Sequence, residues 1–313
     1  MIVTVYRDGN RLNRANALPS DIPVEDILWI DLNTPGPEEK QSVEQLLNVT
    51  LQTRQEAEEI ESSSRYTETD EEIIANSNFL VADNGSYRNE PVSFIIKNEV
   101  LVSYRNIELR AFEEMQRKVS YLYRPGNNGY DIFISLFEIR IDRDADLLEI
   151  IAKDISRLSK QITVEQELTE DVILQLTRFQ EIAMMVRENI IDKQRVISAI
   201  LKSDEFPKNQ EKIRIMLKDI GSLIDHTTFS FDRLEYLQNT FLGLVNIEQN
   251  KIIKIFTVVT VIFMPPTLIA SIYGMNFKFI PELSWPYGYP LALALMLLAS
   301  LLTLLVFKRK NWL

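Results

Sequence analysis

Gly274, Met275 and Asn276 follow a long apolar run, and their types and position are suited to contact with a cation. If the run is a helix, its last carbonyl groups lie at the negative end of the helix dipole. These carbonyls and the amide oxygen of Asn276 can accept hydrogen bonds from the water around a cation. Magnesium keeps that water unusually tightly. The tripeptide therefore predicts a contact site for the water shell of a cation at Gly274 and Asn276, with Met275 between them.

A stripe of uncharged polar side chains leads through the same apolar run to the tripeptide. Steps of alternately three and four residues keep side chains on one face of a helix. Such steps, taken from Asn250, collect all four Thr and Ser residues between positions 255 and 272. The stripe consists of Asn250, Ile253, Thr257, Thr260, Met264, Thr267, Ser271 and Gly274.

Two interpretations of this stripe are open. It can be a polar seam that joins two helices, or it can line a water-filled pore built from several copies of the helix. Two helices per chain cannot enclose a pore, so a pore requires a homo-oligomer. A bare divalent ion would be prohibitively costly between uncharged walls, whereas a hydrated one could pass. Apolar rings at Ile253, Phe256 or Met264 could close such a pore by dewetting.

Two segments are predicted to cross a membrane. Residues 255–273 and 289–307 each give 19 positions without a charge, close to the roughly 20 that a bilayer requires. Two buried core helices are the alternative, but the runs are adjacent and flanked by charge. Lys251, Lys254 and the basic residues at 308–310 place both chain ends in the cytoplasm.

The predicted boundaries are a first span at about residues 252–273, an outer loop at 274–288, a second span at 289–307 and a basic tail at 308–313. The outer loop carries Lys278 and Glu282 as its only charged residues. Glu282 could raise the local concentration of cations at the mouth of a pore.

Charge is distributed unevenly over the 313 residues. The chain has 34 Lys and Arg and 45 Asp and Glu, but only six basic residues and one acid follow residue 250. The tail is therefore +5 and the first 250 residues are −16. An acidic body argues against nucleic acid as a partner. The chain has no Cys, one His, no Gly-rich phosphate loop and no zinc-ligand spacing, which argues against an enzyme.

The body that precedes the spans divides into an α/β part, a helical hairpin and a stalk. In residues 1–106, strands are predicted at 1–6, 27–32, around Tyr66, and at 73–81, 92–97 and 100–105, with helices at 38–47 and 53–61. Helices are then predicted at 107–122, 130–161 and 170–201, with a stop at residues 124–126 and Thr169 as a helix cap.

No proline lies between Pro207 and Pro265, so one helix is predicted from residue 207 to 273. Its 67 residues would span about 100 Å, too long for one compact domain. The predicted domains are a cytoplasmic part at 1–250 (α/β 1–106, helical hairpin 107–206, stalk 207–250) and a transmembrane pore domain at 251–313. The fold class is an α+β domain in α/β/α layers, followed by a very long stalk helix and two transmembrane helices.

The run YGMNF, then IPELSW, then the terminal KRKNWL resembles the CorA family of magnesium transport proteins. The stretch NIEQNKIIK at 246–254 resembles the proteobacterial branch of that family, and WIDL at 29–32 extends the likeness more weakly toward the start of the chain. The resemblance implies a homopentameric funnel in a bacterial inner membrane that admits Mg2+, and also Co2+ and Ni2+.

The resemblance also implies roles for individual residues. Gly274, Met275 and Asn276 would form the selectivity entrance, Met264 a hydrophobic constriction, and Asn250 the inner mouth. Intracellular Mg2+ would gate the channel by binding acids between protomers. Asp219 and Asp225 on the stalk are the candidates for those acids, and an ordinary solvated surface is the alternative explanation for them.

Three hypotheses follow. The first is a Mg2+ channel that needs no cofactor, with Mg2+ as substrate and regulator and lipid and divalent cations as its partners. The second is a zinc transporter of the same family. The third is a membrane-anchored oligomeric sensor or scaffold, in which the stalk merely holds the copies together.

Overall fold

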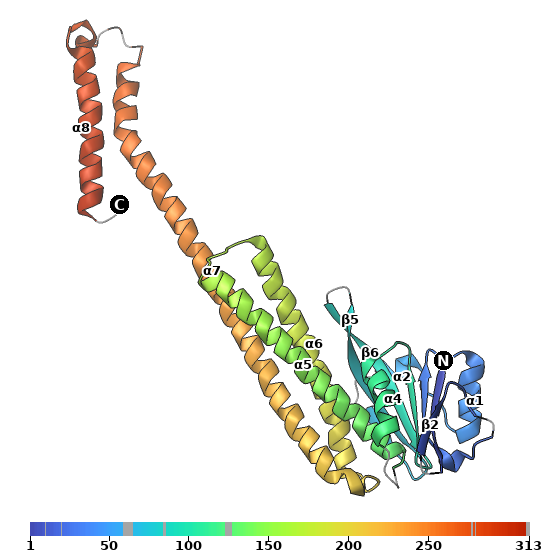
Figure 1. Cartoon of the computed structure of the whole chain (residues 1–313). Helices are drawn as coiled ribbons and strands as arrows, with labels where there is room; N and C mark the ends of the chain where they lie inside the picture. Colours follow the sequence, from blue (N-terminus) through green and yellow to red (C-terminus); the bar gives the residue numbers. More distant parts are fainter. Residues whose placement is uncertain are drawn as a thin grey trace. The chain divides into compact units, whose positions relative to one another are not determined.

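The computed structural model describes residues 1–9, 11–19, 21–58, 65–83, 86–122, 127–276, 278 and 280–310. The chain forms two compact units, which we call the body (residues 1–238) and the apolar unit (residues 239–313). Helix α7 (Gln210–Tyr273) contributes to both. The body combines a sheet with long helices, and the apolar unit holds two apolar helices (Figure 1). These features agree with the predicted fold class.

Seven strands form the sheet of the body, in the order β2-β1-β3-β7-β6-β5-β4. Strands β3 and β7 pair in parallel, and the other neighbours pair antiparallel. The strands are β1 (Ile2–Asp8), β2 (Arg11–Ala15), β3 (Ile27–Asn33), β4 (Tyr66–Glu68), β5 (Ile73–Asp83), β6 (Ser86–Lys97) and β7 (Val100–Arg105).

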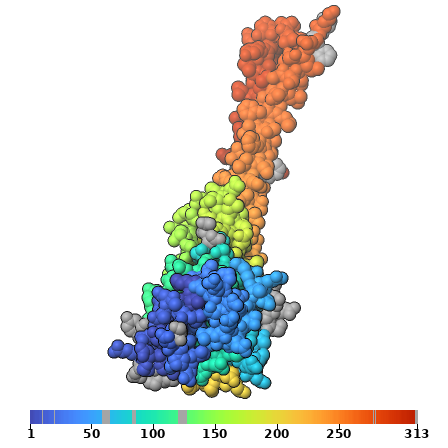
Figure 2. Space-filling model, turned by 90° about the vertical axis from the view of Figure 1, so that its right-hand side faces the viewer, coloured from blue at the N-terminus to red at the C-terminus, as the bar shows by residue number. Residues whose placement is uncertain are grey.

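One face of this sheet packs against helix α1 (Pro37–Leu47). Ile30 and Leu32 of β3 join Val43 and Leu47 of α1 in one buried apolar cluster. All seven residues of β3 are buried, as expected of a continuous apolar strand that is covered on both faces. Figure 2 looks onto the α1 side of the body, where the blue N-terminal part of the chain forms much of the surface.

The opposite face of the sheet is covered by α4 (Arg110–Leu122) and α5 (Gly129–Thr163). Five buried phenylalanines meet there, with ring centroids of successive neighbours between 5.0 and 6.4 Å apart. Such aromatic pairs add stabilisation beyond the area they bury. The five are Phe79, Phe94, Phe112, Phe133 and Phe137. The body therefore has the layered α/β/α arrangement predicted from the sequence.

Asp31 of β3 is a buried charge on the α4 face. Its carboxylate accepts from Arg105 at 2.8 Å, from Ser103 at 2.9 Å and from Gln116 of α4 at 2.9 Å. Ser103 in turn accepts from Trp29 Nε1 at 2.9 Å. Burial of a charge is tolerated when it is paired and hydrogen-bonded in this way. The WIDL stretch thus contributes a buried strand and also Asp31, whose hydrogen bonds connect that strand to β7 and α4.

Gly129 lets the first turn of α5 approach the turn between β6 and β7. Its N–H donates to the Glu99 carbonyl at 2.7 Å. A Cβ at this position would lie 2.5 Å from the Glu99 oxygen and 2.5 Å from the Leu101 nitrogen, both of them backbone atoms. Only glycine fits so close an approach. This contact fixes where α5 starts on the sheet.

Helices α5 and α6 (Glu170–Lys202) form the predicted antiparallel hairpin, and the first part of α7 packs along it. Lys212 of α7 pairs with Glu138 of α5 at 2.7 Å, and Gln238 accepts from Gln180 of α6 at 3.1 Å. Apolar residues of α7 at near-heptad spacing are buried here, as the pattern predicts. They are Ile213, Met216, Ile220, Leu234 and Leu237.

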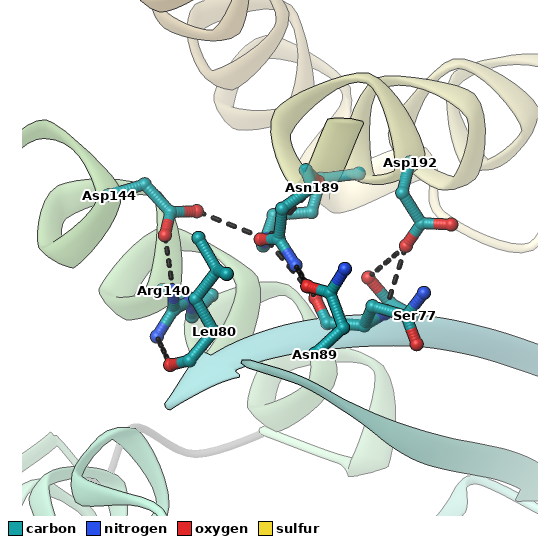
Figure 3. A network of polar contacts seen from close by, with 9 residues as sticks. Ser77, Leu80, Asn89, Arg140, Asp144, Asn189 and Asp192 are labelled. Carbon is teal, nitrogen blue, oxygen red and sulfur yellow. Dashed lines mark hydrogen bonds and ion pairs between the residues drawn. The ribbon is translucent and has the colours of Figure 1, made fainter. Parts of the chain in front are cut away.

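A buried polar network joins this hairpin to the sheet (Figure 3). Lys193 Nζ on α6 lies 3.1 Å from Asp144 Oδ2 on α5, and it donates to Asn189 Oδ1. Arg140 pairs with Asp144 and donates to the Leu80 carbonyl of β5 at 3.2 Å. Loss of water on burial lowers the pKa of Lys193 to about 8, although the Asp144 carboxylate acts in the opposite direction.

The second half of the network is centred on Asp192 of α6. Its carboxylate accepts from Ser77 Oγ at 3.0 Å and from the Asn78 N–H at 2.9 Å. It also pairs with Arg65 Nε at 2.9 Å. Together the two halves hold three cations and two carboxylates. One buried positive charge is therefore in excess within this network, and Lys193 is the one cation among them that can lose its proton.

Some details differ from the sequence prediction. Strand β2 was not predicted, because its RLNRA side chains are mostly polar and the strand depends on pairing with β1. Helix α4 begins at Arg110 rather than at residue 107. Thr169 precedes α6 but makes no side-chain capping bond. Helix α2 (Arg54–Glu58) covers part of the predicted 53–61 helix; the rest of that prediction, and the stop at 124–126, lie outside the described residues.

The long helix begins one turn later than predicted, because Pro207–Asn209 forms a short 3-10 turn before α7. In the apolar unit, α7 ends at Tyr273 and α8 (Gly288–Arg309) follows a second 3-10 turn at Pro281–Ser284. Both helices are long and apolar enough to span a membrane.

Candidate functional site

The end of α7 presents the tripeptide to solvent. The Gly274 N–H donates to the Ala270 carbonyl at 2.9 Å, and the Met275 N–H donates to the Ile272 carbonyl at 3.3 Å, so the last turn tightens. Gly274, Met275 and Asn276 are all exposed. The backbone conformation of Gly274 does not require glycine, and a Cβ would meet the Ala270 oxygen at 3.2 Å. Nothing within the described chain covers this end of α7.

The polar stripe lies on the exposed face of α7. Every member from Asn250 to Gly274 is exposed, and so is Phe256. The half-buried residues of this part of the helix are Val258, Val261, Ile262, Pro265, Pro266, Ile269 and Tyr273. At 100° per residue most of this second set points away from the stripe. The stripe therefore does not form the seam between α7 and α8 of the same chain.

The half-buried face of α7 is the one that meets α8. Pro266 has no N–H to donate to the Ile262 carbonyl four residues earlier. The Ser300 hydroxyl of α8 donates to that carbonyl at 3.4 Å instead. In a membrane, a carbonyl left unpaired in this way would be costly. Ser300 was not singled out from the sequence, because its role depends on a partner on another helix.

The threonines of the stripe are oriented by their own helix. Thr257, Thr260 and Thr267 each donate their hydroxyl hydrogen to the carbonyl four residues earlier, at 2.8 Å. The hydrogen of each hydroxyl is thereby used, and the free lone pairs can only accept. Water around a cation points its hydrogens outward, so these oxygens suit the water shell of a cation and not that of an anion.

The same face is hollowed next to the first two threonines. An open groove of about 330 Å³ is lined by Ile253, Phe256, Thr257, Thr260 and Val261. It brings two of the three apolar residues predicted to close a pore, Ile253 and Phe256, together with two of the hydroxyls. The groove is uncharged, in keeping with the stripe as a whole.

The outer loop holds Glu282 at the 3-10 turn before α8. Glu282 and Lys278 are both exposed, and the Glu282 carboxylate makes no hydrogen bond or ion pair with the residues that the structure describes. Trp285 and Tyr287 follow it with an edge-to-face ring contact at 6.0 Å. Aromatic residues of this kind are typical of a membrane–water interface.

The stalk acids lie in the body and apart from the tripeptide in sequence. Asp219 and Asp225 are both exposed on α7. Burial raises the pKa of Asp142 on α5, and the negative charges of Glu138, Asp146 and Asp219 raise it further. Asp219 therefore lies near other acids, and a bound cation would reduce the repulsion between their carboxylates. Among the described residues no three His, Asp or Glu side chains form a ready-made metal cage.

Comparison with known proteins adds independent findings. Residues 24–309 match the family model described as CorA-like Mg2+ transporter protein. The Magnesium transport protein CorA of Wolinella succinogenes is 44% identical over 320 residues, covering 100% of both chains. The protein of the same name from Escherichia coli K12 is 38% identical over 317 residues, again covering 100% of both.

Solved structures share the fold at lower identity. The complete CorA magnesium transporter from Methanocaldococcus jannaschii superposes with a TM-score of 0.84 at 20% identity, covering 100% of this chain and 99% of that one. The full-length CmaX protein gives 0.74 at 15% identity, covering 100% and 98%. The family match spans nearly the whole chain, and the relatives are similar over their full length. The chain belongs to the CorA-like Mg2+ transporter family.

Proposed function

We propose that this chain forms a channel that admits Mg2+ across a bacterial inner membrane. The observation that carries the proposal is the exposed, uncharged stripe on α7, which faces away from α8 and runs to Gly274. Polar side chains on the outer face of an apolar helix cost free energy where they contact lipid. That cost disappears where they contact water. The family is a transporter family rather than an enzyme class, which agrees with this function.

The pore is built from α7 helices of several copies. One chain offers two apolar helices, and two helices cannot enclose a water-filled path. A closed ring of identical chains can, with each α7 turning its stripe inward. We assign five copies to the ring, on the likeness to the family. Asn250 lies at the inner mouth, and Ile253, Phe256 and Met264 form the apolar rings that close the path.

The selectivity filter is the ring of Gly274, Met275 and Asn276. Carbonyl oxygens near Gly274 and the Asn276 amide accept hydrogen bonds from the water shell of Mg2+, so the ion enters without being stripped. Thr257, Thr260, Thr267 and Ser271 continue this contact along the path. The inner end of the path is flanked by Lys251 and Lys254, so the body lies on the cytoplasmic side.

The domains follow from that topology. Residues 1–250 are the cytoplasmic part and residues 251–313 the membrane part, with both termini in the cytoplasm and the 274–288 loop outside. The same filter accepts Co2+ and Ni2+, which carry similar water shells. Mg2+ in the cytoplasm stabilises the closed ring by bridging acids between protomers, with Asp219 and Asp225 as the proposed contacts.

Reconstituted protein tests the channel directly. Liposomes that contain the purified chain and a trapped Mg2+ indicator should show Mg2+ entry, and Asn276→Ala should abolish most of it. Asn239→Ala changes an exposed asparagine of α7 far from the filter and should leave entry unchanged. Zn2+ entry without Mg2+ entry would favour the zinc transporter, and no entry of any divalent ion would favour a sensor or scaffold.

A further inference from the structure

Gly288 is the first residue of α8 and the one buried residue in the segment 281–291. Its burial comes from the backbone of Glu282. An added Cβ would lie 2.1 Å from the Glu282 carbonyl oxygen and 3.1 Å from its carbonyl carbon. Real Cβ atoms do not approach backbone this closely, and a backbone group cannot rotate away as a side chain can. Glycine is therefore required for the turn to rest on the start of α8.

The turn between these residues is closed by hydrogen bonds. The Gly288 N–H donates to the Trp285 carbonyl at 3.0 Å, and the Trp285 N–H donates to the Glu282 carbonyl at 3.3 Å. Ser284 Oγ donates to the Pro281 carbonyl at 2.8 Å. Pro281 restricts its own φ angle. The backbone of Glu282 is thus fixed on α8 from both sides.

The side chain of Glu282 is in a different situation from its backbone. The carboxylate is exposed and has no hydrogen bond or ion pair with the described residues. It is the only acid in residues 251–313. The backbone of Glu282 is held in place, while its carboxylate is exposed to the surroundings of the chain. A cation would complement the charge of this carboxylate.

We propose that Gly288 is a positioning residue for cation capture, which holds Glu282 against the start of α8 so that the carboxylates of all copies stand at fixed places around the mouth. This proposal rests on the proposed function, because it needs the loop to lie at the entrance of a Mg2+ path. A ring of carboxylates at fixed positions concentrates a divalent cation better than the same charges on flexible loops. Gly288 acts through Glu282 and does not contact the ion.

The test measures Mg2+ entry into liposomes over a series of Mg2+ concentrations for four proteins: the unmodified chain, Gly288→Ala, Glu282→Gln and the double variant. Gly288→Ala should raise the half-saturating Mg2+ concentration by about twofold to fivefold, the size expected for one exposed charge contact, with maximal entry retained. In the Glu282→Gln background, Gly288→Ala should have no further effect, because the group it positions is already neutral.

Gly243→Ala is the matched control, since a Cβ at Gly243 meets nothing within 4 Å; it should leave the half-saturating concentration unchanged. The proposal is overturned if Gly288→Ala lowers maximal entry alone, or if its effect adds to that of Glu282→Gln. No entry through the unmodified protein would refute the proposed function instead.

A second variant covers the case in which Gly288→Ala does not assemble. Ser284→Ala removes the Ser284–Pro281 bond without adding bulk, and it should raise the half-saturating concentration in the same direction and only while Glu282 is present. An unchanged half-saturating concentration in Ser284→Ala would contradict the positioning role.

Discussion

Lys193 Nζ on α6 lies 3.1 Å from Asp144 Oδ2 on α5, and both side chains are only 1% exposed. Asp144 lies where the helical hairpin meets the sheet (Figure 3), and Lys193 Nζ also donates to the Asn78 carbonyl of β5 at 3.3 Å. Arg140 shares the Asp144 carboxylate, and Arg65 occupies the nearby Asp192. A buried cation beyond those that the two carboxylates neutralise must cost stability while it is charged.

The first prediction concerns the pH dependence of stability. The pKa of Lys193 is about 8 in the folded chain and about 10.4 when unfolded. Between these values the unfolded state binds more protons, so the free energy of unfolding rises with pH, by up to about 1.4 kcal/mol per pH unit. Below the pKa of the folded chain, Lys193 is charged in both the folded and the unfolded state. The full free-energy cost of burying the ammonium group is then present.

Lys193→Met should therefore be more stable than the unmodified protein at pH 7, and that advantage should shrink as pH approaches 10. Unfolding curves in detergent from pH 7 to 10 measure it. The range ends there because burial raises the pKa of Tyr130 to about 12, so tyrosine ionisation lowers stability at higher pH.

Lys153→Met is the control, because Lys153 lies in an exposed pair with Glu149. This variant should keep the pH slope of the unmodified protein. A flat pH profile of stability in all three proteins would refute the prediction.

The second prediction concerns the hydroxyls of the stripe. Thr267→Val keeps the shape of the side chain but removes the oxygen that faces away from α8. Mg2+ entry should fall by about tenfold, as expected from the loss of one hydrogen-bond acceptor per subunit. The melting temperature should not fall, since the residue is exposed.

Thr303→Val provides the matched control for that experiment. Thr303 lies on α8 and makes the same bond to the carbonyl four residues earlier, at 2.8 Å, but it is not part of the stripe. Its replacement should leave Mg2+ entry within about twofold of the unmodified protein. Equal losses for both variants would show that the hydroxyl matters for the helix and not for the path.

The third prediction concerns control by intracellular Mg2+. If Mg2+ bridges acids between protomers, millimolar Mg2+ should raise the melting temperature of the solubilised protein, because a ligand that binds the assembled state stabilises it. Asp219→Asn and Asp225→Asn should reduce this rise. Asp232→Asn, another exposed acid on α7, should not. A melting temperature that is insensitive to Mg2+ would count against this form of gating.

The fourth prediction concerns the close contact between Gly129, at the start of α5, and the turn between β6 and β7. Gly129→Ala should lower the free energy of unfolding of the body by about 2–4 kcal/mol, because the new methyl group meets two backbone atoms at 2.5 Å. Gly221→Ala places the same group in open space on α7 and should raise it by about 1 kcal/mol, the difference in helix propensity. Similar effects of the two substitutions would mean that the contact is not rigid.

The sequence alone determined the features that depend on local spacing. The 3–4 step of Asn250, Thr257 and Thr267 becomes one face of a helix because an α-helix has a fixed period. The two uncharged runs predict two apolar helices, and the β-branched run at 27–32 predicts a buried strand, for equally local reasons. These predictions needed no knowledge of distant residues.

Only the tertiary structure decided which distant groups meet. Lys193 with Asp144, Ser300 with the carbonyl that Pro266 leaves unpaired, and Gly288 with the backbone of Glu282 are contacts set by packing. The spacing of residues along the chain carries no signal for them, because the angle and offset at which helices pack depend on all the side chains between them. The same reason explains why strand β2, which β1 stabilises, was not predicted.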